Sequence, residues 1–289
     1  MKNITLKTLT KYTKKKYITI WSISTIIGTS IILYTLLFTR LDLINGIPTN
    51  KWAYLTIGLG ILITITPPSI INLIRQRRIN LIDREIPLVL SELSDGTRAG
   101  LTLIEAIERS AKLSKTPLRN TLTQTLTKIK LGLNIEDALN ITAKKLESKF
   151  STHFIEILKQ TLKSGGNITE TLSTSAKLYK ELLLFNEEKH TELRPYTFII
   201  YLSFTIYLII AYITVNQFIL TLTKTPTTGF IALINPNFYY AIFFYTSLMQ
   251  AIFGGLVIGK ITEGTTKAGL IHTTIMTTIL LTTYPIITG

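Results

Sequence analysis

The 289-residue sequence contains no cysteine and only three histidines. A chain without cysteine cannot form disulfides or bind a metal through thiolates. The histidines, His153, His190 and His272, lie far apart, and none has the spacing of a metal-binding pair or belongs to a recognisable nucleophilic triad. The sequence therefore offers no candidate catalytic residue and no metal site, and it predicts no bound cofactor.

Acidic residues are almost absent outside one stretch of the chain. Residues 75–194 hold 15 of the 17 Asp and Glu and 20 of the 31 Lys and Arg. This distribution is typical of a membrane protein with one polar insert. The net charge of +14 arises partly from six lysines in residues 1–16. A basic tail beside an apolar run fits membrane orientation better than nucleic-acid binding, so no nucleic-acid partner is expected.

Five apolar runs are long enough to predict five transmembrane helices. They are Tyr17–Thr39, Trp52–Ile74, Tyr196–Leu222, Phe238–Gly259 and Ala268–Ile287. For the first run, a cleaved signal peptide or a pilin-type leader is the alternative, but the run is longer than the apolar region of a signal peptide and no cleavage site is evident. Pro67 and Pro68 should bend the second run or make its last third an interfacial segment, because proline removes a backbone donor.

Basic residues predict the orientation of these helices. By the positive-inside rule, the lysine tail together with Arg75, Arg77 and Arg78 places the amino terminus and the polar insert on the cytoplasmic side of the cell membrane. Five spans then leave the carboxyl terminus outside. The predicted parts are residues 1–79 with the tail and two spans, residues 80–194 as a cytoplasmic helical domain, and residues 195–289 with three spans.

The insert is expected to be all-α, since no segment alternates with the period of a strand. Its first helix should begin near Asn80 and break at Asp95–Gly96. The apolar face of that helix is Ile82, Ile86, Val89, Leu90 and Leu93. The later helices are expected at Thr102–Leu113, Pro117–Leu131, Ile135–Leu146, Ser151–Lys163 and Ile168–Leu193. About six helices in antiparallel pairs result, and a continuation of the last one through Pro195 would couple the insert rigidly to the membrane.

One short phrase occurs three times in the insert, at spacings of 32 and 33 residues. A glycine that can adopt a positive φ should end one helix, a Thr or Asn two residues later should cap the next, and an acidic residue should complete a capping box. The glycines are Gly100, Gly132, Gly165 and Gly166, and the capping pairs are Thr102 with Glu105, Asn134 with Asp137, and Asn167 with Glu170. Chance recurrence of a common cap is the alternative.

Two features of the apolar runs have competing interpretations. Residues 254–260 have the glycine spacing of a phosphate-binding loop, but Ile261 stands where a Ser or Thr should bind magnesium. Gly255 and Gly259 are better explained as a small-residue contact between two membrane helices. His272 lies inside the last run, where an ionisable side chain is either functional or hydrogen-bonded to a neighbouring helix.

A basic cluster surrounds the second phrase. Its members are Lys128, Lys130, Lys144, Lys145 and Lys149. Two interpretations are open. The cluster is either a solvated helix face with acidic residues nearby or a docking surface for an acidic partner.

The three glycine phrases resemble the cytoplasmic domain of type II secretion system F-type proteins, the inner-membrane platform proteins of type II secretion and type IV pili. Residues 250–264 and 268–272 resemble the archaeal branch, which includes archaellum platform proteins and relatives of the tight-adherence pilus pair. The resemblance covers about residues 80–288. Residues 163–166 depart from the Gly-Glu usual in bacterial members, and many relatives carry two such domains. Both differences fit a single-domain, tight-adherence-like archaeal member.

This resemblance implies a non-enzymatic scaffold. A hexameric secretion ATPase would dock on the helical domain, with Lys128, Lys130, Lys144 and Lys145 as the expected contacts, and pilin-like subunits would be lifted into a growing filament. A single-domain member would pair with itself or with a sister platform subunit, surrounded by membrane lipid.

A small-solute transporter or channel is the alternative function. Such a protein needs polar or charged groups that face the inside of its membrane bundle. The apolar runs contain almost no acidic residues, and their polar groups are mainly threonines, Asn216, Gln217 and His272. Many of those threonines are expected to bond to their own helix backbone, which leaves few groups to line a pathway.

Overall fold

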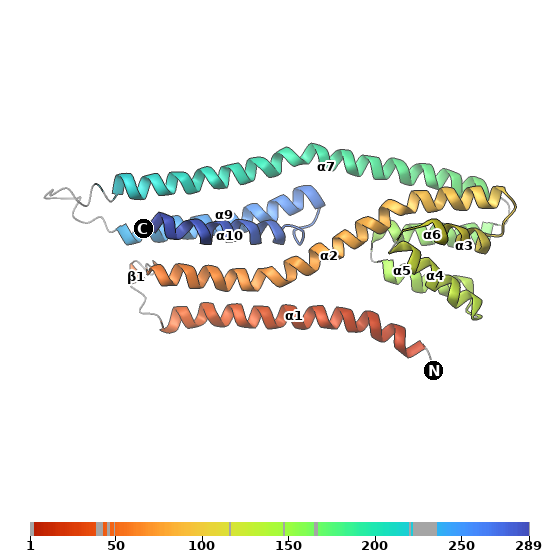
Figure 1. Ribbon diagram of the computed structural model, residues 1–289, viewed down its shortest axis with the longest axis horizontal. Helices are drawn as coiled ribbons and strands as arrows, with labels where there is room; N and C mark the ends of the chain where they lie inside the picture. The colour runs from red at the N-terminus through yellow and green to blue at the C-terminus, as the bar shows by residue number, and fades with distance from the viewer. Residues whose placement is uncertain are drawn as a thin grey trace. The chain divides into compact units, whose positions relative to one another are not determined.

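The computed structural model describes residues 3–38, 43–44, 47–48, 50–115, 117–146, 148–164, 167–219, 221 and 236–288. Within these residues the chain is almost entirely helical (Figure 1), which confirms the predicted all-α class. The α-helices are α1 (Asn3–Phe38), α2 (Lys51–Arg98), α3 (Leu103–Leu113), α4 (Leu118–Lys130), α5 (Ile135–Leu146), α6 (Lys149–Ser164), α7 (Ile168–Ile213), α9 (Pro236–Glu263) and α10 (Leu270–Thr288). A π-helix, η1 (Thr214–Ile219), follows α7 directly.

A small hairpin was not expected from the sequence. Strands β1 (Leu43–Ile44) and β2 (Ile47–Pro48) pair antiparallel, with Ile44 opposite Ile47. Each strand has two residues, which is too short for an alternating pattern to be recognised.

The chain divides into two compact units. We call residues 74–189 the helical unit, and residues 1–73 with 190–289 the membrane unit. Within the described part of the chain, five helices are long and apolar enough to cross a membrane, as predicted. They are Thr19–Leu37, Trp52–Arg98, Ile168–Gln217, Pro236–Glu263 and Leu270–Ile287. The second and third of these helices extend into the helical unit, and the apolar part of α2 ends at Ile74.

The predicted break at Asp95–Gly96 is wrong, because α2 continues to Arg98. It is also continuous through Pro67 and Pro68, because a proline removes one backbone hydrogen bond without having to end a helix. The bend or interfacial segment that we expected at these prolines stays a prediction. Gly96 serves packing, since an added Cβ would lie 3.1 Å from the Cβ of Ala106 on α3. A small residue is therefore needed there for α3 to approach α2.

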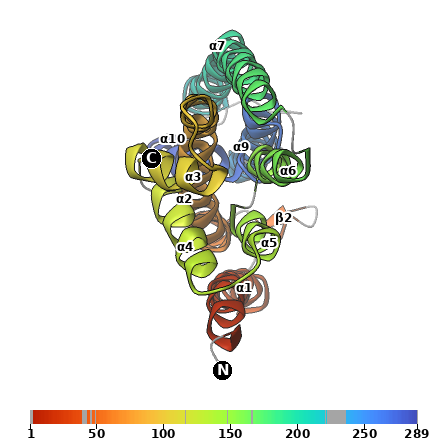
Figure 2. The same ribbon diagram turned by 90° about the vertical axis from the view of Figure 1, so that its right-hand side faces the viewer.

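The helical unit has one hydrophobic core to which all its helices contribute. Its helices α3 to α6 are labelled in the view of Figure 2. The predicted apolar face of α2 is buried, with Ile82, Ile86 and Leu93 at most 1% exposed. Leu122 from α4 and Phe154 from α6 pack into the same core. Helices α3 to α6 contact one another in chain order, as short connections between antiparallel neighbours favour.

The membrane unit has a separate core. Phe204 of α7, Phe244 of α9 and Leu280 of α10 are fully buried in it. Helices α9 and α10 lie side by side (Figure 1). Large apolar side chains also cover the outside of the unit, with Leu37 68% and Phe198 67% exposed. An exterior as apolar as the interior suits helices surrounded by lipid.

Candidate functional site: glycine-capped turns, basic helix pair and membrane contacts

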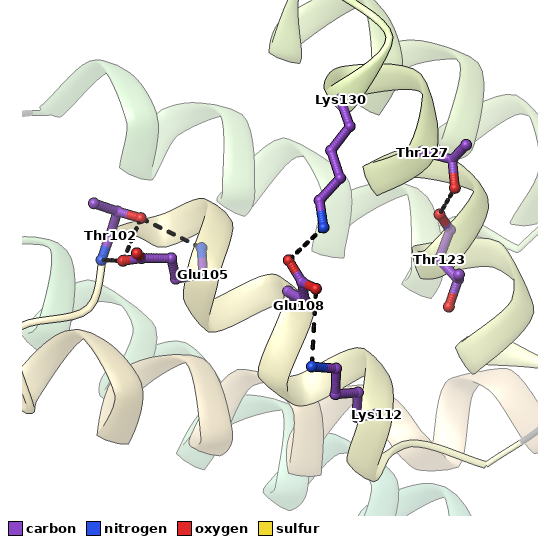
Figure 3. Close-up of polar contacts among 7 residues, drawn as sticks. All are labelled: Thr102, Glu105, Glu108, Lys112, Thr123, Thr127 and Lys130. Carbon is purple, nitrogen blue, oxygen red and sulfur yellow. Dashed lines mark hydrogen bonds and ion pairs between the residues drawn. The ribbon is translucent and has the colours of Figure 1, made fainter.

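The first glycine phrase forms a complete turn-and-cap unit. Gly100 has φ of 86° and follows the end of α2, and the Leu101 N–H donates to the Gly96 carbonyl oxygen at 3.1 Å, which closes the helix end. Thr102 and Glu105 form a capping box at the start of α3 (Figure 3). The Thr102 N–H donates to Glu105 Oε2 at 2.8 Å, and the Glu105 N–H donates to Thr102 Oγ1 at 3.3 Å. Donation from the Thr102 N–H holds the pKa of Glu105 below its ordinary value.

The second phrase repeats the turn but not the box. Gly132 has φ of 88°, and the Leu133 N–H donates to the Lys128 carbonyl oxygen at 3.1 Å. Asn134 Oδ1 accepts from the Glu136 N–H at 3.0 Å, so the cap is made without the side chain of Asp137 that we expected to take part. An Asn cap of this kind satisfies one backbone donor where the Thr–Glu box satisfies two.

The third phrase is described only in part. Gly165 and Gly166 lie outside the described residues. Asn167 Nδ2 donates to the carboxylate of Glu170, and the Thr171 N–H donates to the Asn167 carbonyl oxygen at 3.1 Å. The Asn and the acidic residue of this phrase therefore meet at the start of α7.

The described structure places the four candidate docking lysines on different sides of α4 and α5. Lys130 Nζ lies 2.8 Å from Glu108 Oε2 on α3, and Lys112 Nζ lies 3.8 Å from the other oxygen of the same carboxylate (Figure 3). Donation from Lys130 lowers the pKa of Glu108. Lys144 is exposed on α5. Both ion pairs of Glu108 are solvent-exposed and therefore contribute little to stability, and only the one with Lys130 joins α3 to α4.

Lys128 lies on a different side of α4 from Lys130, and Lys145 of α5 reaches α4 through Gln124. Both are half-buried, and Lys145 Nζ donates to Gln124 Oε1 at 2.7 Å. Burial lowers the pKa of Lys128, and the positive charge of Lys145 lowers it further. Burial also lowers the pKa of Lys145, with a further contribution from Arg78 on α2. The side chain of Lys149 lies outside the described part of the chain.

Two features of the helical unit were missed in the sequence. Arg78 was assigned to membrane orientation only, yet its positive charge also helps to lower the pKa of Lys145 on α5. Asp83 of α2 accepts from Ser148 Oγ at 2.8 Å and from Ser151 Oγ at 2.5 Å, at the amino terminus of α6. Ser148 Oγ also accepts from the Ser151 N–H at 2.9 Å. The sequence alone could have indicated Ser148 as a cap before α6, but it could not indicate its partner Asp83, which lies 65 residues earlier in the chain.

In the membrane unit, Gly255 and Gly259 form a close contact between α9 and α10. A Cβ on Gly255 would collide with Thr273, and a Cβ on Gly259 would collide with the backbone of Gly269. Both glycines lie within α9 and face another helix, which is a packing arrangement and lacks the strand-to-helix loop of a phosphate site.

His272 of α10 contacts Tyr201 of α7. Its Nδ1 lies 3.0 Å from the Tyr201 hydroxyl oxygen, and the two rings meet edge to face with centroids 5.9 Å apart. Threonines of the spans bond to their own helix backbone, as Thr205 does to the Tyr201 carbonyl oxygen and Thr278 does to the Thr274 carbonyl oxygen. Among the described residues, His, Asp and Glu side chains nowhere gather in a group of three that could hold a metal ion.

An open groove lies between α6 and α7 in the helical unit. Its apolar lining includes Ile157, Leu178 and Leu182, and His153 and Glu156 contribute polar groups. The two leucines are 52% and 41% exposed. The groove therefore presents apolar side chains at the surface of the helical unit.

Comparison with known proteins agrees with the glycine phrases. Residues 89–215 match the sequence model of the family described as "Type II secretion system (T2SS), protein F". "Uncharacterized protein MJ1286" of Methanocaldococcus jannaschii is 26% identical over 194 residues, which cover 67% of this chain and 32% of the relative. The chain thus matches about a third of that relative's length. No solved structure matches the chain. The resemblance to the T2SS protein F family is confirmed for residues 89–215, a segment that begins in α2 and extends into η1.

Proposed function

We propose that the chain is a platform protein of a filament-assembly machine in the cell membrane. A cytoplasmic secretion ATPase would act on the helical unit, and the membrane unit would pass that motion to filament subunits of the pilin type. The observation that carries this proposal is α7. This helix of 46 residues runs unbroken from Ile168 to Ile213, and all of it lies in the segment that matches the T2SS protein F family.

A continuous helix can transmit displacement because each turn is held to the next by backbone hydrogen bonds. α7 begins beside the third glycine phrase, contributes Leu172 and Tyr179 to the core of the helical unit, and contributes Phe204 to the core of the membrane unit. α2 likewise belongs to both units. Pro195 removes one backbone donor from α7 at the point where the apolar run begins.

Contacts inside the membrane unit would carry the motion further. Tyr201 links α7 to His272 of α10, and α10 packs tightly on α9 through Gly269 and Gly259. Polar and small-residue contacts of this kind fix one helix against another in lipid, where apolar side chains gain little by meeting. Movement of α7 would therefore be passed to α10 and α9.

The proposed orientation follows from charge. The positive-inside rule puts the helical unit in the cytoplasm, where a secretion ATPase is available. For the ATPase contact we retain Lys130 and Lys144, whose side chains are exposed. Lys128 and Lys145 are half-buried in a separate cluster and are less accessible to a protein surface. The filament would be a type IV pilus or an archaellum, with a second copy or a sister subunit completing the platform, in keeping with the sequence resemblance.

Co-purification from the native cell in a mild detergent, followed by mass spectrometry, tests this function. The wild-type chain should recover a secretion ATPase or pilin-like subunits. Lys130→Glu with Lys144→Glu should reduce ATPase recovery at least about tenfold, because like charges across an interface are costly. The control is Lys177→Glu with Lys180→Glu, two exposed lysines of α7. If the wild-type chain recovers neither partner, the proposed function is contradicted. If the Lys130→Glu and Lys144→Glu variant recovers as much ATPase as the wild type, only the proposed ATPase contact is contradicted.

A further inference from the structure

The open groove between α6 and α7 continues into an exposed apolar stripe on α7. In the groove, the rings of Phe150 and Tyr179 meet with centroids 4.3 Å apart, and the Tyr179 hydroxyl donates to the Phe150 carbonyl oxygen at 3.1 Å. Leu178 and Leu182 line the groove from α7. Phe185, which is 63% exposed, extends their row, because residues three and four apart share one side of a helix.

Acidic side chains border this groove. Glu156 of α6 lines it, and its carboxylate is 3.1 Å from Lys159 Nζ, which offsets part of its charge. Glu181 and Glu188 are exposed on α7, one turn before and one turn after Phe185. Neither of these two glutamates belongs to an ion pair within the described part of the chain. The groove is therefore apolar along its centre and negatively charged at its edge.

A second exposed apolar surface of the helical unit lies on α2 and the end of α3. We call it the leucine patch, and it consists of Leu81, Leu88 and Leu113, which are 54%, 51% and 53% exposed. Leu81 and Leu88 are seven residues apart on one side of α2. Glu85 lies between them and accepts from the Lys115 N–H at 3.0 Å. This hydrogen bond brings the end of α3, with Leu113, to the same side of α2.

Basic side chains border the leucine patch. Lys112 and Lys115 lie on either side of Leu113 in the chain, and both are exposed. Lys112 has an ion pair with Glu108 at 3.8 Å, and Lys115 has none among the described residues. The groove and the leucine patch thus have apolar centres and edges of opposite charge. Opposite charges around two apolar surfaces favour their association and fix how they meet.

The groove and the leucine patch also lie at a similar level of the helical unit. Arg84 of α2 and Glu187 of α7 form an ion pair at 3.2 Å, so they mark one level of the two helices. Arg84 lies between Leu81 and Leu88 in the chain, and Glu187 follows Phe185 by two residues. Helical units placed side by side can therefore bring the patch of one against the groove of another. Two identical grooves would repel each other through their acidic edges.

We propose that the helical units of two copies of this chain bind head to tail, with the leucine patch of one copy in the groove of the next. The leucines would cover the apolar centre of the groove, while Lys112 and Lys115 approach Glu181 and Glu188. A pair joined in this way leaves one groove and one patch uncovered, so further copies can add until a ring closes. This inference rests on the proposed function, which includes a second copy, and it names the surfaces that join the copies.

Cysteine cross-linking tests this contact, because the sequence contains no cysteine of its own. Two differently tagged copies are expressed together in the native cell, one with Leu182→Cys and the other with Leu113→Cys. A short bifunctional maleimide should then join the two tagged copies. In the control, Lys180→Cys replaces Leu182→Cys and should lower the cross-linked fraction at least about fivefold, since residues two apart face different sides of a helix.

Each cysteine variant expressed alone should give no cross-linked pair. A pair formed by Leu182→Cys alone would show that two grooves face each other, and it would overturn the head-to-tail contact. The contact is also overturned if Leu182→Cys is joined to a different protein instead of a second copy. If no cross-link forms while the wild-type chain still recovers the ATPase, the contact is wrong and the proposed function stands.

Charge reversal separates the contact from a general loss of structure. Glu181→Lys with Glu188→Lys in the copy that carries Leu182→Cys should lower the cross-linked fraction about tenfold, because like charges then meet. Lys112→Glu with Lys115→Glu in the other copy should do the same. The two reversals together should restore cross-linking to within about twofold of the unreversed pair, since opposite charges face each other again. If the combined reversal does not restore it, these edges do not meet.

Discussion

The helical unit and the membrane unit are both all-helical, yet different interactions determine their packing. In the helical unit, apolar faces turn inward, charged residues cover much of the surface, and glycine turns with polar caps define where helices end. In the membrane unit the outside is as apolar as the inside, so burial of apolar surface gives little direction. There, glycine contacts and single polar contacts such as Tyr201 with His272 decide which helices meet.

Glycine has a different role in each of the two units. Gly100 and Gly132 adopt a positive φ and have open space around the position of a Cβ, so their value is conformational. Gly255 and Gly259 are ordinary helical residues whose missing Cβ lets another backbone approach. Replacing one of these glycines by alanine should therefore destabilise the helical unit through backbone strain, and the membrane unit through collision of the new Cβ with a neighbouring helix.

The largest effect is expected for Gly259→Ala. Its Cβ would collide with the backbone of Gly269, which cannot rotate away, so α9 and α10 must separate. We expect a loss of about 3 kcal/mol or more in the free energy of unfolding. Gly254→Ala on the same helix is the matched control, because its Cβ would lie 3.2 Å from a side-chain atom of Ile200, which can move. Unfolding in detergent measures both, and equal losses would contradict the packing role.

A smaller but substantial effect is expected at Asp83. Asp83→Leu leaves the hydroxyls of Ser148 and Ser151 without their acceptor, which should cost about 2 to 3 kcal/mol. Asp83→Asn keeps an acceptor oxygen and should cost less than about 1 kcal/mol. Denaturant unfolding of the full chain, followed by hydrogen exchange in α6, compares the two variants. If Asp83→Leu and Asp83→Asn have the same free energy of unfolding, the hydrogen bonds between α2 and the start of α6 do not stabilise the helical unit.

A smaller loss of stability is expected from backbone strain at Gly100. Gly100→Ala is expected to destabilise the helical unit by about 1 kcal/mol, because alanine rarely adopts a φ of 86°. Gly100→Asn should cost less, since asparagine tolerates this conformation better than other side chains. Hydrogen exchange at the end of α2 and the start of α3 provides the measurement. A loss for Asn as large as the loss for Ala would argue against strain as the cause.

The smallest expected effect is a pH dependence of the first cap. The pKa of Glu105 is held below its ordinary value of 4.5 by the hydrogen bonds from Thr102, first from the backbone N–H. The stabilisation from this carboxylate is therefore complete above pH 4.5 and is lost as the pH falls through the lowered value. Exchange of the first amides of α3, corrected for intrinsic rates, should rise over that range. Glu105→Gln should abolish this pH dependence. If amide exchange in the wild-type chain does not depend on pH over this range, the capping box of Thr102 and Glu105 does not stabilise α3.

The helical period and the cap chemistry are local, so they could be predicted. The spacing of Ile82, Ile86 and Leu93 is sufficient to identify the buried face of α2, and the bounds of α5 agree with those expected. The continuity of α2 through Gly96 could not be predicted, because it depends on Ala106 of another helix. Contacts between distant segments leave no local pattern.

The candidate site shows the same limit. The sequence identifies Lys128 and Lys145 as basic residues near the second phrase, but not that Lys145 bonds to Gln124 of α4 while Lys130 pairs with Glu108. Arg78 is 67 residues from Lys145 in the chain. The pairing is decided by the way α2, α4 and α5 pack around one core.

The central claim is that continuous α7 transmits motion from the helical unit to the membrane unit. Insertion of four glycines between Glu192 and Leu193 interrupts α7 at their junction, and the same insertion after Ser114, in the turn between α3 and α4, is the control. Filaments of cells that carry each variant are counted by electron microscopy, with ATPase co-purification as a check. The account predicts that the α7 insertion retains the ATPase and abolishes filaments, while the control forms them. Normal filaments with an interrupted α7 would contradict it.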